Sequence, residues 1–355
     1  MPTTLIFAIG RNWRPYLFSV LIPVLFLCTG RAQAGVGLGE IPATTSDGTI
    51  TLFYPTQAVE QQLRRGRFVL NLAERAEPVR GNGRLIVISH GSGGGPWVHV
   101  NLARALVEAG FVVAMPQHHA DNFMDDSNPG PDSWTLRPAE MSRTIDAVGR
   151  DARFASLLTL DKVGIYGMSA GGHTALSMAG GRWSPDGFRQ HCEASLEEDF
   201  QACVGLITRL TGGMLDGIKK WAATLVIRHR FSDATPREHH DPRVAAVVAG
   251  VPTAADFDMS SLEHPAMPVA LITAGQDRWL IPRFHSDLVL QACKSCVRLA
   301  ELPAAGHGAL LSPLPPGLTG LLGDMLNDPP GFDRSQMAEV DQKITHFFEQ
   351  QLLQK

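Results

Sequence analysis

The sequence predicts an α/β protein with a mostly parallel central sheet that is covered by helices on both faces. Short apolar segments rich in Val and Ile alternate with stretches of helical periodicity, and this alternation is typical of parallel sheets whose connections are helices. The composition agrees, because 44% of the residues are hydrophobic and 19% are charged, which is enough for a large core. At 355 residues, we expect one domain with an insertion rather than two domains.

Six apolar segments are interpreted as buried core strands, because each is bounded by turn residues. Helical periodicity connects them in three places, and two earlier segments are expected to add antiparallel edge strands. The core strands are residues 85–89, 111–115, 163–166, 244–249, 269–273 and 297–302, the edge strands are residues 50–54 and 68–72, and the helices are residues 100–109, 141–158 and 172–179.

Residues 182–243 interrupt this alternation with two cysteines, a Trp-containing helical segment and a charged, His-rich loop. We interpret this stretch as an insertion into the domain. Ligands of open α/β sheets bind beyond the carboxyl ends of the strands. An insertion that leaves the sheet there would cover the site as a lid.

The N-terminal segment has the order of features of a secretory signal peptide. Arg11 and Arg14 precede an apolar run over residues 17–27, and the small residues of Ala32-Gln33-Ala34 follow. We therefore expect residues 1–34 to be cleaved. The mature domain would then be residues 35–355, and the protein periplasmic or secreted.

The sequence disfavours two alternatives to cleavage. In a membrane anchor the apolar run would have to cross the bilayer, but it is about 11 residues long and is broken by Pro23, whereas a span needs roughly 20 residues. In a lipoprotein Cys28 would carry the lipid, but Leu27 stands where such signals have a small residue. Cleavage is favoured, and no stable membrane span is expected in the mature chain.

The other four cysteines would lie in an oxidising compartment, where an even number favours pairing. Four cysteines allow three connectivities, and we favour Cys192–Cys203 with Cys293–Cys296 because each pair is close in sequence. The spacing of the second pair is also that of thioredoxin-type motifs. Those motifs open a helix after a strand, whereas this pair precedes a strand-like segment.

The charge balance excludes one class of partner. The formal net charge is −4, so the chain offers no basic field that would attract nucleic acid. No nucleic-acid partner is expected.

The hexapeptide Gly167-Met168-Ser169-Ala170-Gly171-Gly172 follows a predicted strand and precedes a predicted helix. It fits the pattern G-x-S-x-G, in which a sharp strand-to-helix turn exposes a nucleophilic serine. The small flanking residues let neighbouring chain segments pass close to that turn. This context makes Ser169 the candidate nucleophile.

A glycine-rich loop, residues 90–95, directly follows the predicted strand 85–89. In enzymes whose nucleophilic serine lies on such a strand-to-helix turn, the loop at this position supplies one donor of the oxyanion hole. The residue after the nucleophile supplies the other donor. We therefore assign the oxyanion hole to the backbone N–H groups of Ser92 and Ala170. A phosphate-binding loop is the alternative, but the lysine of a P-loop and the G-x-G-x-x-G spacing are both missing.

His307, between Gly306 and Gly308, follows the last predicted strand and is the candidate general base. Asp277 follows the strand before it and is the candidate acid that would orient the imidazole. The strand-to-helix turn at Ser169 is called a nucleophile elbow. In proteins with such an elbow, the serine, the acid and the histidine follow one another along the chain in the order Ser, Asp, His. Asp256 and Asp258, one strand earlier, are the alternatives for the acid, and the position at the strand end favours Asp277.

Two groups of His and Asp residues raise the question of metal binding. Neither group has an H-E-x-x-H arrangement or a matching set of cysteines. We interpret both as solvated loops and expect no metal and no cofactor. They are His118 and His119 with Asp121, Asp125 and Asp126, and His239 and His240 with Asp241.

Residues 85–307 resemble the α/β-hydrolase superfamily, and within it the dienelactone-hydrolase-like and platelet-activating-factor-acetylhydrolase-like esterases. This resemblance implies the α/β-hydrolase fold and esterase activity. Dienelactone hydrolases use a cysteine nucleophile, whereas this chain has Ser169, which favours ordinary carboxylic esters. The matching features are Tyr54-Pro55, Ser89-His90-Gly91, the strand 111–113 that leads to Pro116, the elbow at residues 167–172, and Asp277 with Pro282.

We therefore expect a serine carboxylic-ester hydrolase that acts on a small-molecule ester through an acyl-enzyme on Ser169. Trp97, Trp134 and Trp183 are candidates for lining the acyl or alcohol pocket, with buried aromatic packing as the alternative. The fold leaves other functions open. They are a dienelactone hydrolase-like enzyme, an acyltransferase, thioesterase or peptidase, and a binding protein that no longer turns over substrate.

Overall fold

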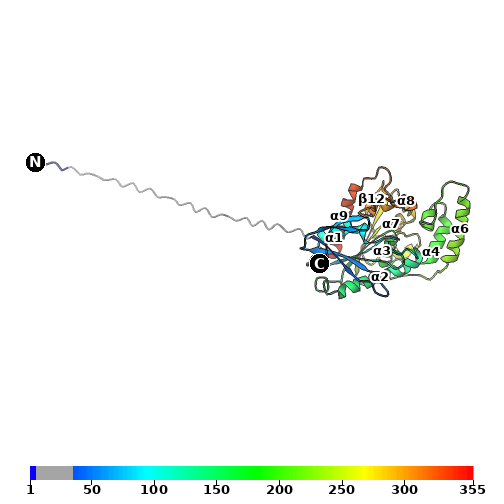
Figure 1. The fold of residues 1–355 in the computed structure, drawn as a ribbon, viewed down its shortest axis with the longest axis horizontal. Coiled ribbons are helices and arrows are strands. Elements are labelled where there is room, and N and C mark those ends of the chain that lie inside the picture. Colours follow the sequence, from blue (N-terminus) through cyan, green and yellow to red (C-terminus); the bar gives the residue numbers. More distant parts are fainter. Residues whose placement is uncertain (5–34, 355) are drawn as a thin grey trace. The chain divides into compact units, whose positions relative to one another are not determined.

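A computed structural model describes residues 1–4 and 35–354 (Figure 1). Apart from residues 1–4, the predicted signal peptide lies outside the described residues. In the part that is described, no helix is both long enough and apolar enough to cross a membrane.

Within residues 35–354, ten strands form one sheet in the order β12-β11-β9-β7-β5-β6-β2-β1-β4-β3. The six strands from β12 to β6 are mutually parallel. Beyond them β2 pairs antiparallel with β6 and β1, and β3 pairs antiparallel with β4. The bounds are β1 Gly35–Ile41, β2 Ile50–Thr56, β3 Gln61–Arg65, β4 Phe68–Glu74, β5 Leu85–Ser89, β6 Val112–Pro116, β7 Val163–Met168, β9 Val244–Gly250, β11 Val269–Ala274 and β12 Val297–Leu302.

All eight predicted strands are present, and their bounds differ from the prediction by two residues at most. The prediction that β2 and β4 are edge strands is wrong, because β2 lies between β6 and β1, and β4 lies between β3 and β1, with which it pairs in parallel. The core strands β5, β6, β7 and β9 are buried over almost their whole length, as apolar parallel strands between two helical layers should be. β1 and β3 were not predicted. β3 has the polar sequence QQLRR and lies at the sheet edge, where apolar periodicity is not required.

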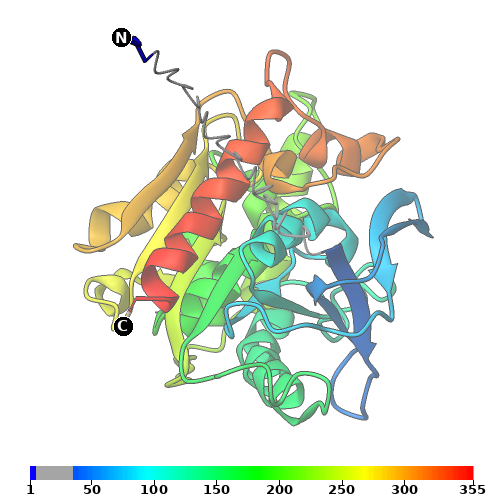
Figure 2. The same ribbon diagram turned by 90° about the vertical axis from the view of Figure 1, so that its left-hand side faces the viewer.

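Helices cover both faces of the sheet. On one face α1 (Val100–Glu108) and α9 (Met337–Leu352) pack side by side, as Figure 2 shows. On the other face lie α2 (Pro131–Arg150) and α3 (Ala170–Met178). The predicted helices 100–109 and 172–179 match α1 and α3.

The predicted helix 141–158 is wrong at both ends. α2 begins at Pro131, ten residues earlier, and ends at Arg150. Pro138 lies inside α2, although proline removes one backbone donor and disfavours a helix interior. Burial of Trp134, Met141 and Ile145 in the core on either side of Pro138 offsets that cost.

Residues 182–243 contain the short strand β8 (Arg182–Trp183) and the helices α4 (Pro185–Ser195), α5 (Phe200–Val204) and α6 (Asp216–Arg230). β8 pairs with β10 (Phe257–Asp258) in a separate two-stranded sheet. In Figure 1, α4 and α6 lie together beyond the end of α3.

Both predicted disulfides are confirmed. Cys192–Cys203 joins α4 to α5. Cys293–Cys296 closes the turn between α7 (Ser286–Ala292) and β12.

Candidate active site

Ser169 occupies a sharp turn between the end of β7 and the start of α3, with φ 58° and ψ −120°. A positive φ is strained for a residue other than glycine. The neighbouring glycines allow the turn, because an added Cβ at Gly167 would lie 1.9 Å from the carbonyl oxygen of Gly171. A Cβ at Gly171 would lie equally close to the carbonyl oxygen of Ser89. The backbone therefore has the geometry that the G-x-S-x-G pattern predicts.

Ser169, His307 and Asp277 form one hydrogen-bonded chain. The Oγ of Ser169 lies 3.0 Å from Nε2 of His307, and Nδ1 of His307 lies 2.7 Å from Oδ2 of Asp277. The other carboxylate oxygen of Asp277 accepts the backbone N–H groups of Trp279 and Leu280 at 2.8 and 2.9 Å. The side chains of Ser169, His307 and Asp277 are each at least nine-tenths buried. The carboxylate and its two backbone donors therefore hold the imidazole with Nδ1–H toward Asp277 and the Nε2 lone pair toward Ser169.

The alternative acids have other partners. Asp256 accepts a hydrogen bond from Nε2 of His173 at 3.0 Å, and both side chains are fully buried. Asp258 is exposed and forms an ion pair with Arg182. Neither carboxylate is within hydrogen-bond reach of His307, so the geometry favours Asp277.

The glycine-rich loop begins directly beside the serine. A Cβ added at Gly91 would lie 3.4 Å from Cβ and 3.9 Å from Oγ of Ser169. Ser92 follows in that loop, and Ala170 is the first residue of α3. The first N–H groups of a helix have no partner within it. The two candidate oxyanion donors thus lie on the two segments that flank Ser169.

The prediction that the first His and Asp group is a solvated loop holds for His119, Asp125 and Asp126, which are exposed, and is wrong for His118 and Asp121. His118 and Asp121 are fully buried beneath the glycine-rich loop. Nδ1 of His118 donates to Glu140 at 2.6 Å, so its Nε2 accepts the hydroxyl of Ser89 at 2.8 Å. Burial lowers the pKa of His118 well below its usual value and raises the pKa of Glu140. In the second group, Asp241 is buried against Arg243.

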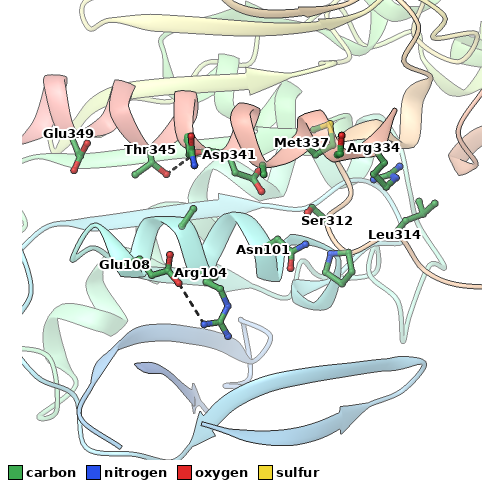
Figure 3. Close-up of a pocket in the computed structure, with 15 residues that line it drawn as sticks. Asn101, Arg104, Glu108, Ser312, Leu314, Arg334, Met337, Asp341, Thr345 and Glu349 are labelled. Atoms are coloured by element: carbon green, nitrogen blue, oxygen red, sulfur yellow. Dashed lines mark hydrogen bonds and ion pairs between the residues drawn. The ribbon is translucent and has the colours of Figure 1, made fainter. Parts of the chain in front are cut away.

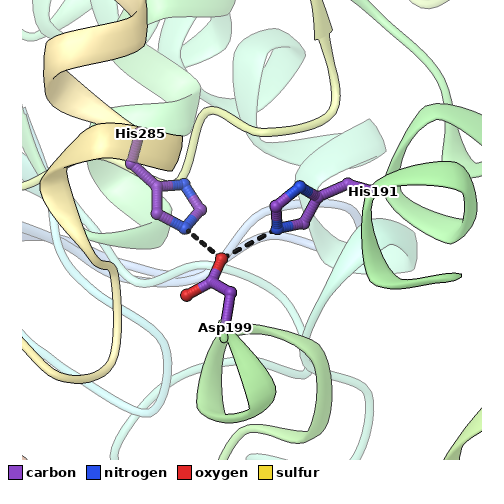
Figure 4. Close-up of side chains that lie close together, drawn as sticks. All are labelled: His191, Asp199 and His285. Carbon is purple, nitrogen blue, oxygen red and sulfur yellow. Dashed lines mark hydrogen bonds and ion pairs between the residues drawn. The ribbon is translucent and has the colours of Figure 1, made fainter. Parts of the chain in front are cut away.

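A third cluster, His191, Asp199 and His285, was not predicted, because its residues come from three separate segments (Figure 4). Oδ2 of Asp199 lies 2.8 Å from Nε2 of His191 and 3.1 Å from Nε2 of His285. Nδ1 of His285 accepts the backbone N–H of Ala254 at 3.0 Å. Its Nε2 therefore carries the proton and cannot also offer a lone pair to a metal. The donor set fits a carboxylate that holds two imidazoles better than it fits a metal centre.

A groove of about 890 Å³ lies between α1 and α9 (Figure 3). Its lining includes Asn101 and Arg104 from α1 and Asp341 and Thr345 from α9. Ser169, His307 and Asp277 do not line it. Burial raises the pKa of Asp341 to about 7. The groove is thus separate from the candidate active site.

The tryptophans divide between packing and surface. Trp134 and Trp183 are buried and lie around His173, with ring centroids 4.7 and 4.6 Å from its ring. Trp97 is half-buried, and the guanidinium of Arg65 lies over its ring. Buried aromatic packing is thus the arrangement of Trp134 and Trp183. Phe123 is a better candidate for a substrate contact, since it is exposed and packs on Gly95 of the glycine-rich loop.

The parallel sheet, the helices on both faces and the turn at Ser169 define the α/β-hydrolase fold, which confirms the predicted fold class. The solved structure of a ferulic acid esterase from Streptomyces cinnamoneus is similar, with a TM-score of 0.57 and 15% sequence identity over 91% of each chain. No protein-family model matches the chain, and no curated protein matches its sequence.

Proposed function

We propose that this protein is a serine carboxylic-ester hydrolase that acts through an acyl-enzyme on Ser169. The observation that carries the proposal is the hydrogen-bonded chain from Ser169 through His307 to Asp277. A nucleophile, a base and an orienting acid in this geometry are the parts of a catalytic triad. The fold shared with a ferulic acid esterase supports the same chemistry.

In the proposed reaction, Ser169 Oγ attacks the ester carbonyl carbon while His307 Nε2 takes the hydroxyl proton. The carbonyl oxygen becomes an oxyanion, which accepts hydrogen bonds from the N–H groups of Ser92 and Ala170. The tetrahedral intermediate collapses, the C–O bond to the alcohol breaks, and His307 returns the proton to the leaving alcohol. Water then attacks the acyl-enzyme with His307 again as base, which releases the acid and restores Ser169.

These contributions require no cofactor. Removal of one oxyanion donor costs about 10²- to 10³-fold in kcat in comparable enzymes. General base catalysis contributes roughly another 10²- to 10⁴-fold. Asp277 adds to the base by holding the tautomer and by stabilising the imidazolium that forms.

The substrate class is a small ester of ordinary carboxylic acids. Serine stands where dienelactone hydrolases carry cysteine, which disfavours dienelactones. Exposed apolar side chains beside the site and along α6 support a hydrophobic acyl or alcohol group. They include Phe123, Met124, Ile218, Trp221 and Leu225.

Residues 182–243 serve as a lid over this site. Arg230 of α6 donates to Asn128 and Asp132, at 2.9 and 3.0 Å, in the segment that follows β6. Arg209 forms an ion pair with Asp324, in the segment that follows β12. Both segments leave the carboxyl ends of parallel strands, where ligands of this fold class bind.

The enzyme acts in the periplasm or outside the cell. Two disulfides are consistent with an oxidising compartment. The signal-peptide features of residues 1–34 support the same location.

Turnover of short-chain p-nitrophenyl esters by the purified protein, beside a Ser169→Ala variant, tests the proposal. We expect turnover by the normal protein and none above background by the variant. An enzyme that transfers the acyl group to an added alcohol in preference to water would instead be an acyltransferase. A normal protein that releases acid from no ester, thioester or peptide would be a binding protein.

A further inference from the structure

We infer that Asp121 and His90 are positioning residues that clamp the glycine-rich loop so that the Ser92 peptide N–H faces Ser169. The inference rests on the proposed function, because an oxyanion donor matters only if an oxyanion forms. Both residues act through the loop rather than on the substrate.

Asp121 anchors the loop at Ser92 and Gly93. Its Oδ1 accepts the hydroxyl of Ser92 at 2.6 Å and the backbone N–H of Gly93 at 2.9 Å. The Ser92 hydroxyl is thereby committed to Asp121, which leaves the backbone N–H as the donor that this residue can offer to a substrate. Gly93 has φ 62°, so the loop bends tightly at the point where Asp121 grips it.

Arg137 holds Asp121 in turn. Both side chains are fully buried, and Nη2 of Arg137 lies 2.7 Å from Oδ2 of Asp121. The same guanidinium donates to the carbonyl oxygen of His90 at 2.6 Å and to Ser133 at 3.0 Å. Burial alone would raise the pKa of Asp121, but Arg137 and the loop donors outweigh it and hold that pKa below its usual value. The carboxylate therefore stays ionised and keeps accepting from the loop.

His90 fixes the orientation of the peptide unit itself. The backbone N–H of His118 points at Nε2 of His90, at 3.4 Å, so Nδ1 carries the proton and donates to the carbonyl oxygen of Gly91 at 2.7 Å. The N–H of Gly94 donates to the same oxygen at 3.0 Å. In a planar trans peptide the carbonyl and the following N–H point in opposite directions. Anchoring the Gly91 carbonyl therefore aims the Ser92 N–H the other way.

The clamp matters because the loop is mostly glycine. Glycine loses more conformational freedom on ordering than any other residue, and a free Gly-rich loop would sample many orientations of its N–H groups. Oxyanion donors are effective only when they are ordered before the reaction. A buried ion pair contributes little net stability compared with apolar packing, so the Asp121–Arg137 pair is better explained by the geometry that it imposes.

Two substitutions, one control and one rescue variant test the inference. Ser92→Ala removes the hydroxyl but keeps the N–H, and it lies on an exposed residue, so the fold should tolerate it. Asp121→Ala removes the grip altogether. Asp241→Asn is the matched control, because Asp241 is also a buried partner of an arginine but precedes β9, at the opposite end of the sheet.

We expect kcat to fall about tenfold in Ser92→Ala and about 10²-fold in Asp121→Ala, by comparison with loss of a whole donor, with KM changed less than about threefold. Ser92→Thr restores the hydroxyl and should recover most of the loss. A trifluoromethyl ketone, which forms a tetrahedral oxyanion adduct with the serine, should lose affinity in parallel with kcat/KM. Asp241→Asn should change the melting temperature without changing either quantity.

Unchanged kcat and unchanged ketone affinity in both Ser92→Ala and Asp121→Ala would overturn the inference. So would equal losses in Asp241→Asn, since the effect would then be one of general stability. If the normal protein neither hydrolyses ester nor binds the ketone, the proposed function itself fails. This outcome is distinguished from failure of the inference because it is seen with the normal protein, without any variant.

Discussion

Asp277→Asn is a substitution for which the structure predicts a large effect on activity with a small effect on the fold. Oδ1 of Asp277 accepts two backbone N–H groups, and Oδ2 accepts Nδ1–H of His307. In the variant, the amide oxygen must stay with the two backbone donors, because an NH₂ group there would face them. The NH₂ group then points at Nδ1 of His307.

That orientation reverses the imidazole tautomer. Nδ1 must now accept, so Nε2 carries the proton and faces Ser169 Oγ, 3.0 Å away, where it cannot act as a base. The corresponding change lowers kcat about 10⁴-fold in serine proteases. At 1.36 kcal/mol per factor of ten, this is about 5.4 kcal/mol of lost transition-state stabilisation. The folded state loses only the charge on one hydrogen bond, about 1 kcal/mol.

The assay measures kcat and KM with p-nitrophenyl butyrate at pH 7.5, together with the melting temperature. We expect kcat to fall about 10⁴-fold and the melting temperature to fall by about 2 °C. Asp256→Asn is the control, since Asp256 pairs with His173 and should leave kcat within a few-fold of normal. If Asp277→Asn keeps more than a tenth of the activity while Asp256→Asn loses it, the assignment of the acid is wrong.

Three further predictions concern the framework of the site. Gly171→Ala should destabilise the protein by at least about 3 kcal/mol in urea unfolding, because its Cβ would lie 1.9 Å from the Ser89 carbonyl oxygen; a normal unfolding midpoint would contradict this. Replacing Cys192 and Cys203 by serine should cost about 2.8 kcal/mol, from the chain entropy of a separation of 11 residues, and an unchanged midpoint would refute the estimate. Burial alone would raise the pKa of Asp199, but hydrogen bonds from two histidines outweigh it and hold that pKa below its usual value. Asp199 therefore stabilises the fold above about pH 4, and this contribution is lost as the pH falls through the lowered pKa. Asp199→Ala should be less stable than the normal protein at pH 7, and the difference in their free energies of unfolding should shrink as the pH falls toward 3. A difference that does not depend on pH would show that the ionised Asp199 carboxylate is not its cause.

The core of the fold could be predicted from the sequence because each parallel strand is buried on both faces. Such strands read as short apolar segments between turn residues, and β5 and β12 match the prediction residue for residue. The start of α2 could not be predicted in this way, since Pro138 suggests a boundary that tertiary packing overrides. β3, at the sheet edge, carries too little apolar pattern to be recognised.

Part of the candidate site could likewise be predicted from the sequence, and part could not. Ser169, Asp277 and His307 each follow a core strand, and the topology of a parallel sheet brings the ends of such strands together. The grip of Asp121 on the glycine-rich loop could not be predicted, because an aspartate in a loop gives no sign of being buried. The cluster around Asp199 depends on the fold of residues 182–243, for which the sequence offers no periodic signal beyond a few helical turns.

The most direct test of the central claim is to expose the purified protein to a fluorophosphonate probe and locate the adduct by tandem mass spectrometry. The proposed mechanism predicts one adduct, on Ser169, and no labelling of Ser169→Ala or of heat-denatured protein. Labelling at another serine, or equal labelling of Ser169→Ala, would contradict the assignment of the nucleophile.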